Sequence, residues 1–232
     1  MIVIVARQGD ESARSLAARW SAHGALLLSP PDLSIPGWQY NPLAAEASAA
    51  VISRRSIGNS EITGVLTRLS WVFEHELIHV APNDRAYAAS EMNAFLLALL
   101  DGLACPLLNR PTATCLAGPC WRKERWVHFA AGLGIPVCPV RREAKPSDAL
   151  SPEEPQPPSK SVTVVGDRCF GEADETIANC ARQLASAAGA DLLRVHFRDV
   201  DGESRLLGAD LDPDISSTDV ADAILDYFCV NC

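Results

Sequence analysis

The sequence lacks an apolar run long enough to cross a membrane as a helix, and it lacks a cluster of basic residues. Its first apolar run, Ile2 to Val5, is short and has no positively charged segment before it, which is typical of a buried strand and not of a signal peptide. The formal net charge of -9 disfavours contact with a phosphate backbone. These absences predict a cytoplasmic protein with neither nucleic-acid nor membrane partners.

A second pair of closely spaced cysteines is also missing. Of the eight cysteines, only Cys229 and Cys232 have the spacing of paired metal ligands, and no second pair follows at zinc-ribbon spacing. Without a secretion signal, disulfides are not expected. We therefore expect free thiols, with Cys180 buried on the apolar face of a helix.

The first 141 residues alternate between the patterns of strands and helices. Strands are expected at residues 2–5, 25–28, 64–69, 106–109 and 135–140, and helices at 12–23, 85–100 and 121–132. The chain between residues 29 and 63 is expected to be irregular. Strands that alternate with helices favour a mostly parallel sheet covered by helices.

Five prolines and several charges mark residues 142–160, which predicts an extended linker. Beyond it, strands are expected at 162–165, 192–197 and 205–210, with a turn at Asp201-Gly202, and helices near 177–188 and from Ser216 onward. The fold class is therefore predicted as α/β: an N-terminal domain over 1–141, the linker over 142–160, and a smaller α+β lobe over 161–232.

One short motif suggests zinc chemistry. The stretch His75-Glu76-Leu77-Ile78-His79 matches H-E-x-x-H, in which two histidines on one helix face bind zinc and the glutamate activates a bound water. Glu91 could supply a third ligand. A chance match is the alternative, because the strand before the motif and Pro82 after it leave room for roughly three helical turns.

A series of motifs covers most of the chain in a recognisable order. They are an arginine at a strand end (Arg68), a Tyr-Ala-x-x-Glu helix start (87–91), Asn109-Arg110-Pro111, a lysine-bearing helix (Lys123), Gly-Ile-Pro-Val (134–137), Val-Val-Gly-Asp (164–167), and two strands at 193–197 and 206–213. This order resembles the ATP-grasp ligases that modify ribosomal peptides, the microviridin-type cyclases. Cys138 stands where that family usually has a proline.

The resemblance implies a pre-ATP-grasp-like N-terminal domain and a remnant of the last ATP-grasp lobe, with two departures. The central lobe that holds ATP would follow residue 137, where this chain has its proline-rich segment. The positions that would hold magnesium read His196, Gly208 and Asp210. Magnesium prefers oxygen ligands, and a histidine and a glycine do not supply them. We therefore expect a truncated pseudoenzyme that needs no cofactor and does not catalyse ligation.

Five polar or aromatic residues remain as candidates for binding. Arg68, Asn109, Arg110, Trp121 and Lys123 lie at expected strand ends and loop edges, where open α/β sheets place ligands. Each also fits an ordinary surface residue or a local cap, as Asn109 fits a turn. The leading interpretation is an accessory protein that recognises a peptide or a catalytic partner. A zinc hydrolase and an assembly protein that forms homo-oligomers stay open as alternatives.

Overall fold

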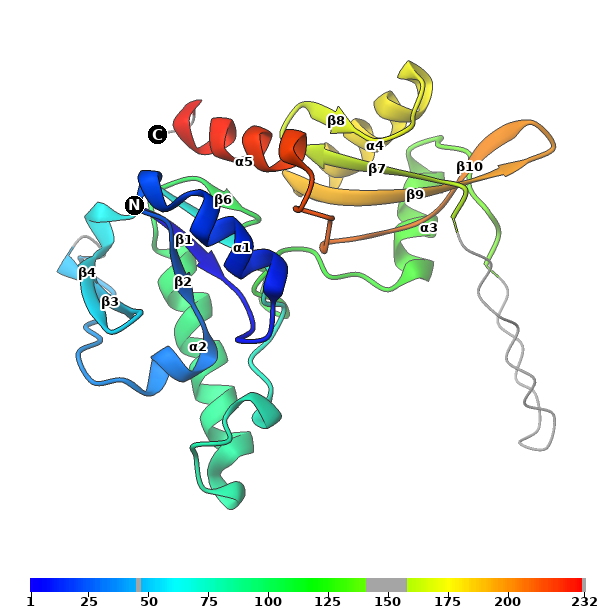
Figure 1. Ribbon diagram of the computed structural model, residues 1–232. Helices are drawn as coiled ribbons and strands as arrows, with labels where there is room; N and C mark the ends of the chain where they lie inside the picture. The colour runs from blue at the N-terminus through cyan, green and yellow to red at the C-terminus, as the bar shows by residue number, and fades with distance from the viewer. Residues whose placement is uncertain (45–46, 141–157, 231–232) are drawn as a thin grey trace.

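The computed structural model describes residues 1–44, 47–140 and 158–230 (Figure 1). The expected linker over 142–160 lies outside the described residues except for its last three, of which Lys160 already begins a strand. The described chain forms two sheets with helices packed on them, so the predicted mixed α/β fold is confirmed. None of the described helices is long and apolar enough to cross a membrane.

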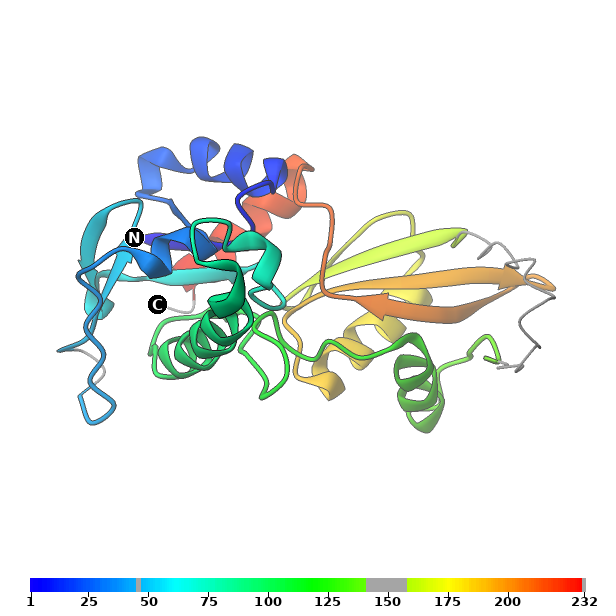
Figure 2. The same cartoon turned by 90° about the horizontal axis from the view of Figure 1, so that it is seen from below.

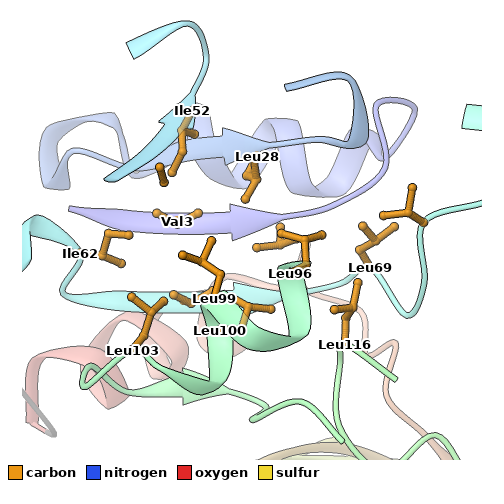
Figure 3. Close-up of a cluster of buried hydrophobic side chains, with 14 of the residues drawn as sticks. Val3, Leu28, Ile52, Ile62, Leu69, Leu96, Leu99, Leu100, Leu103 and Leu116 are labelled. Atoms are coloured by element: carbon orange, nitrogen blue, oxygen red, sulfur yellow. The ribbon is translucent and has the colours of Figure 1, made fainter. Parts of the chain in front are cut away.

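The first sheet is parallel and has the order β2-β1-β5-β6, formed by Leu26–Leu28, Ile2–Val5, Gly64–Thr67 and Leu107–Leu108. Alternation along β1 sends Ile2 and Ile4 toward helix α1 (Glu11–Arg19), and Val3 and Val5 toward the other face. On that other face, leucines of helix α2 (Arg85–Asp101) pack under the sheet (Figure 3). All four strand residues are therefore buried, as a parallel sheet covered on both faces requires.

Residues 29–63, expected to be irregular, contain a hairpin of β3 (Ala49–Ile52) and β4 (Arg55–Gly58). Its two turn residues, Ser53 and Arg54, both have positive φ, at 50° and 62°. Tight hairpin turns of this kind usually carry glycine, asparagine or aspartate, which is the signal that sequence analysis depends on. Neither residue gives that signal, so the prediction for this segment was wrong.

The second sheet is antiparallel and has the order β10-β9-β7-β8. Its strands are β7 (Lys160–Val165), β8 (Arg168–Phe170), β9 (Leu192–Val200) and β10 (Glu203–Asp210), and the expected turn at Asp201-Gly202 joins the last two. Helices α3 (Lys123–Gly132) and α4 (Glu175–Ala188) cover one face (Figure 2).

The strand expected at 135–140 does not form. Only Val137 makes a bridge, to Leu206 at the edge of the second sheet. Pro136 and Pro139 carry no backbone N–H, so this segment cannot sustain a ladder of hydrogen bonds. Two backbone hydrogen bonds join this segment to β10: the Cys138 N–H donates to the Leu206 C=O, and the Leu206 N–H donates to the Pro136 C=O.

Helix α5 (Thr218–Val230) connects the two halves of the chain. It follows the second sheet in sequence, yet Figure 1 shows it beside the first sheet. Its apolar side chains, including Ile224 and Phe228, pack in one cluster with β1 and α1. Gly64 of β5 allows this close approach, because a Cβ there would lie 2.6 Å from the Phe228 ring. The last helix therefore stabilises the first sheet as well as the second.

Candidate functional site

A cleft with a volume of about 1020 Å³ lies at the carboxyl ends of β1, β2 and β5. Loops that follow these strands supply Arg7 to Ser12, the Pro30-Pro31 pair and Arg68, and the end of β10 supplies Asp210 to Asp212. Open parallel sheets place their ligands at this edge, because the loops beyond neighbouring strands converge there. The cleft is therefore the candidate binding site of the described chain.

Arg68 forms the floor of this cleft and is held by charged partners on both sheets' loops. Its Nε lies 2.8 Å from Asp10 Oδ2, one terminal nitrogen lies 2.8 Å from Asp212 Oδ1, and the other donates to the Pro213 carbonyl at 3.2 Å. The Arg68 side chain is only 8% exposed. Asp10 also caps helix α1 by accepting from the Ala13 N–H at 2.9 Å. Arg68 thus ties the first sheet to the segment that follows β10.

Asp210 lines the same cleft within a dense polar network. Its Oδ2 lies 2.6 Å from His196 Nε2 and 3.1 Å from a terminal nitrogen of Arg194, and its Oδ1 accepts from the Asp212 N–H at 2.9 Å. Burial alone would raise the pKa of Asp210, but the hydrogen bond with His196, the Asp212 N–H and the Arg194 guanidinium together lower it. Asp210 is therefore an ionised carboxylate whose two oxygens already have partners.

The three positions that the resemblance assigns to magnesium do not fit that ion. Gly208 offers no side chain, and a Cβ there would lie 3.4 Å from Cγ of Lys123. His196 presents nitrogen atoms, one of which is hydrogen-bonded to Asp210. The guanidinium of Arg194 adds a positive charge beside the one remaining carboxylate, where magnesium requires several oxygen ligands. The Arg194 guanidinium and the His196 ring occupy the space beside Asp210.

The pH dependence of folding should report on Asp10. Burial raises the pKa of Asp10, but the Ala13 N–H and the Arg68 guanidinium lower it to a net value below the ordinary 3.8. A carboxyl with a lowered folded-state pKa stabilises the fold above pH 3.8, and this contribution is lost as the pH falls through the folded-state pKa. We expect Asp10→Asn, which keeps the helix cap, to flatten the loss of unfolding free energy below pH 4 in urea titrations. If Asp10→Asn lost as much unfolding free energy below pH 4 as the wild type, the attribution of this loss to Asp10 would be wrong.

The other predicted binding residues lie outside the cleft. Asn109 is 2% exposed, and its side chain bonds the Leu192 N–H and C=O and the Ala117 C=O, at 2.7, 2.9 and 3.1 Å. Arg110 lines a separate pocket of about 250 Å³ with Asp191 and Tyr227. Asn109 therefore links the two halves of the chain, and its role in binding stays a prediction, as does that of Arg110.

Trp121 and Lys123 lie at the start of helix α3. The Trp121 ring packs against Trp126 and Phe129, with centroid distances of 4.5 and 4.9 Å, and the Arg125 guanidinium lies over it at 4.3 Å. Lys123 is exposed, and its stem lies beside Gly208. Arg68 alone among the five predicted residues lines the large cleft.

The H-E-x-x-H stretch gives no support to the zinc hypothesis. Residues 74–76 form a single 3₁₀ turn, and Leu77 leaves it with φ -102° and ψ 48°, so the two histidines do not share a helix face. His79 Nε2 lies 2.7 Å from Ser34 Oγ. Within the described ranges no three histidine, cysteine, aspartate or glutamate side chains are grouped so that they could hold a metal ion.

The same stretch instead forms the outer wall of the cleft. His75, Glu76 and Ile78 line it, and Ile78 is 76% exposed. Arg7, which follows β1, lies over the Phe73 ring at 5.3 Å and 3.9 Å from Glu76. Neither Arg7 nor Ile78 was predicted as a site residue, because Arg7 belongs to no motif and Ile78 fills an unspecified position of H-E-x-x-H. Only the position of Arg7 just after a buried strand could have indicated it.

The seven cysteines that the structure describes are free thiols, and Cys232 lies outside the described residues. Cys180 is half-buried on the core side of α4. Cys115 is buried next to Cys120, and burial raises its pKa to about 11.

Comparison with known proteins gives matches at the level of structure. No family model matches the chain, and no curated protein matches its sequence. The ATP-grasp ligase PsnB, solved in complex with a minimal precursor, Mg and ADP, superposes with a TM-score of 0.68 at 14% identity, covering 98% of each chain.

Two further ligases superpose similarly. The macrocyclase MdnC from Microcystis aeruginosa MRC, solved with the precursor peptide MdnA, gives a TM-score of 0.71 at 12% identity over 98% of each chain. The RiPP-associated ligase from Chryseobacterium gregarium, solved with ADP and a leader and core peptide, gives 0.68 at 10% identity over 100% of this chain and 97% of that one. The fold of this chain is therefore similar to that of the ATP-grasp ligases that act on ribosomal peptides, as the order of its motifs implied.

Proposed function

We propose that this protein is an ATP-grasp-like accessory protein that recognises a peptide, or a catalytic partner, in a peptide-modification pathway and does not ligate with ATP. The observation that carries the proposal is the network around Asp210. Arg194 and His196 bind the carboxylate that would otherwise help to hold magnesium. Phosphoryl transfer depends on metal ions that neutralise the phosphate charges, and this corner offers no ligand set for them.

We further propose that the central nucleotide-binding lobe is absent, with residues 142–160 in its place. The proline-rich composition of that segment supports this, because it has too few apolar residues to bury a core. Because this segment separates them, we place the end of the N-terminal domain at residue 141 and the start of the C-terminal lobe at residue 161. Helix α5 is the part of the second lobe that packs on the first sheet.

The chemistry of the cleft is compatible with a peptide ligand. Its outer wall offers the exposed Ile78 side chain, and Pro30 and Pro31 add apolar surface. Five carboxylates and two guanidinium groups line it, and both arginines are ion-paired. The excess of negative charge favours a peptide that carries a basic side chain next to an apolar one. The peptide complexes of MdnC and of the Chryseobacterium gregarium ligase support a peptide as the ligand class.

A displayed library of random peptides tests this proposal. We expect the purified chain to enrich peptides with a lysine or arginine beside an apolar residue. The affinity of one such peptide, measured by fluorescence anisotropy, should fall by about tenfold or more in Ile78→Asp, because the change removes the apolar contact. Leu43→Asp is the matched control, since Leu43 is 97% exposed and lies outside the cleft. Equal affinities in both variants, or no enrichment, would refute the peptide assignment.

A further inference from the structure

The corner that has lost its magnesium ligands contains a chain of hydrogen bonds through three side chains. Ser161 Oγ lies 2.9 Å from His196 Nδ1, and His196 Nε2 lies 2.6 Å from Asp210 Oδ2. The three residues come from three neighbouring strands, β7, β9 and β10. Ser161 pairs in register with His196, which pairs with Gly208 on its other side. Serine and histidine are thus opposite each other, and the carboxylate reaches the histidine diagonally, because Asp210 pairs in register with Arg194.

Strand alternation places this chain on the face opposite to helices α3 and α4. Val162 and Val195, the neighbours of Ser161 and His196, are buried in the core under those helices, so strand alternation directs Ser161 and His196 to the other face. Ser161 is half-buried and the His196 side chain is 21% exposed. Gly208, which pairs with His196 on β10, has no side chain that could cover the histidine. The serine therefore lies half-buried on the face of the sheet that α3 and α4 leave uncovered.

The hydrogen bonds also determine where the protons lie. Asp210 Oδ1 accepts from the Asp212 N–H, and Asp210 Oδ2 lies 3.1 Å from the Arg194 guanidinium, so both oxygens act as acceptors, as those of a carboxylate do. The proton of a neutral His196 ring then lies on Nε2, which donates to Asp210, and the lone pair lies on Nδ1. Nδ1 accepts from the Ser161 hydroxyl. A nucleophile bonded to a base, with the base oriented by a third group, is the arrangement that activates serine hydroxyls.

We propose that Ser161 is an activated nucleophile that takes an acyl group from an activated ester, with His196 as its base and Asp210 as the residue that orients the base. Ser161 Oγ attacks the carbonyl carbon while its proton passes to His196 Nδ1. The bond from carbon to the leaving oxygen breaks, and that oxygen takes the proton from Nδ1. The products are an acylated Ser161 and an alcohol. This step uses neither nucleotide nor metal, and it does not depend on the proposed binding of a peptide, although Asp210 also lines the cleft.

A fluorophosphonate probe tests the proposal on the full chain. Ser161 Oγ would form a bond to phosphorus while fluoride leaves, with the proton departing through His196. We expect about one label per chain, which tandem mass spectrometry places on Ser161 in the tryptic peptide 161–168. Ser161→Ala should remove it. His196→Gln and Asp210→Asn should each slow labelling by about 100-fold or more, the range that general base catalysis contributes.

Thr163→Val is the matched control, because Thr163 lies two residues along the same face in the same tryptic peptide. This variant should be labelled at the wild-type rate. Circular dichroism verifies that each variant is folded. Failure of the folded wild type to react, a label on Thr163 or on another residue, or an unchanged rate in both His196→Gln and Asp210→Asn would overturn the proposal. Peptide affinity should be unchanged in Ser161→Ala, so the two proposals can fail independently.

Discussion

Replacing Arg68 with methionine is expected to lower the free energy of unfolding by about 3–5 kcal/mol, the range measured when one partner of a buried ion pair is removed. The Arg68 side chain is 8% exposed and Asp10 is 18% exposed, so neither charge is screened well by water. Methionine keeps much of the volume but leaves Asp10 without its guanidinium partner. The Pro213 carbonyl and Asp212 lose their donors as well. Urea unfolding followed by circular dichroism measures the change.

Arg168→Met is the matched control for this prediction. Arg168 also forms an ion pair at 2.8 Å, with Asp226, but its side chain is 55% exposed and that of Asp226 is 56% exposed. Exposed pairs contribute about 0–1 kcal/mol, so this variant should unfold close to the wild type. Equal destabilisation by the two changes would show that the Arg68 network is not a buried connection between the halves of the chain.

Replacing Asn109 with leucine is expected to cost about 3 kcal/mol or more, because three buried backbone groups lose their partner. The amide of Asn109 accepts from the Leu192 N–H and donates to the Leu192 and Ala117 carbonyls. A leucine has a similar volume but satisfies none of these groups. Since Leu192 begins β9 and Asn109 follows β6, the change removes a direct connection between the two sheets.

Asn179→Leu provides the comparison for Asn109. Asn179 lies on the exposed side of α4, where its side chain accepts from Arg182 at 2.6 Å. A substitution there should change the unfolding free energy by about 0.5 kcal/mol or less. Thermal and urea unfolding of both variants measures the difference. If Asn109→Leu were no more destabilised than Asn179→Leu, the structural role given to Asn109 would be wrong.

The sequence predicted the elements whose patterns are local. The run from Ile2 to Val5 and the turn at Asp201-Gly202 both lie where expected, because strand alternation and glycine-containing turns leave clear traces. The hairpin turn at Ser53-Arg54 left no such trace. Nor could spacing show that helix α5 packs on the first sheet, since that contact depends on Gly64 making room for Phe228.

The candidate site was predictable to a lesser degree. The order of motifs indicated Arg68, which follows β5, and the three positions that the resemblance assigns to magnesium, which lie on β9 and β10. It gave no sign that Arg194 would bind Asp210 or that Ser161 would reach His196. The first contact depends on the register of the β9–β10 hairpin, which shifts at a bulge between Leu206 and Gly208. The second joins β7 to β9, which are separated in the sequence by β8 and α4, so the tertiary fold sets their pairing.

Hydrolysis of ATP by the purified chain, with and without a bound peptide and magnesium, tests the central claim most directly. We expect no ATP hydrolysis above that of a buffer control. Arg194 and His196 bind the Asp210 carboxylate, and Gly208 offers no side-chain ligand for magnesium. Magnesium-dependent turnover that is abolished in Asp210→Ala would contradict this expectation and show that the chain is a working ATP-dependent enzyme.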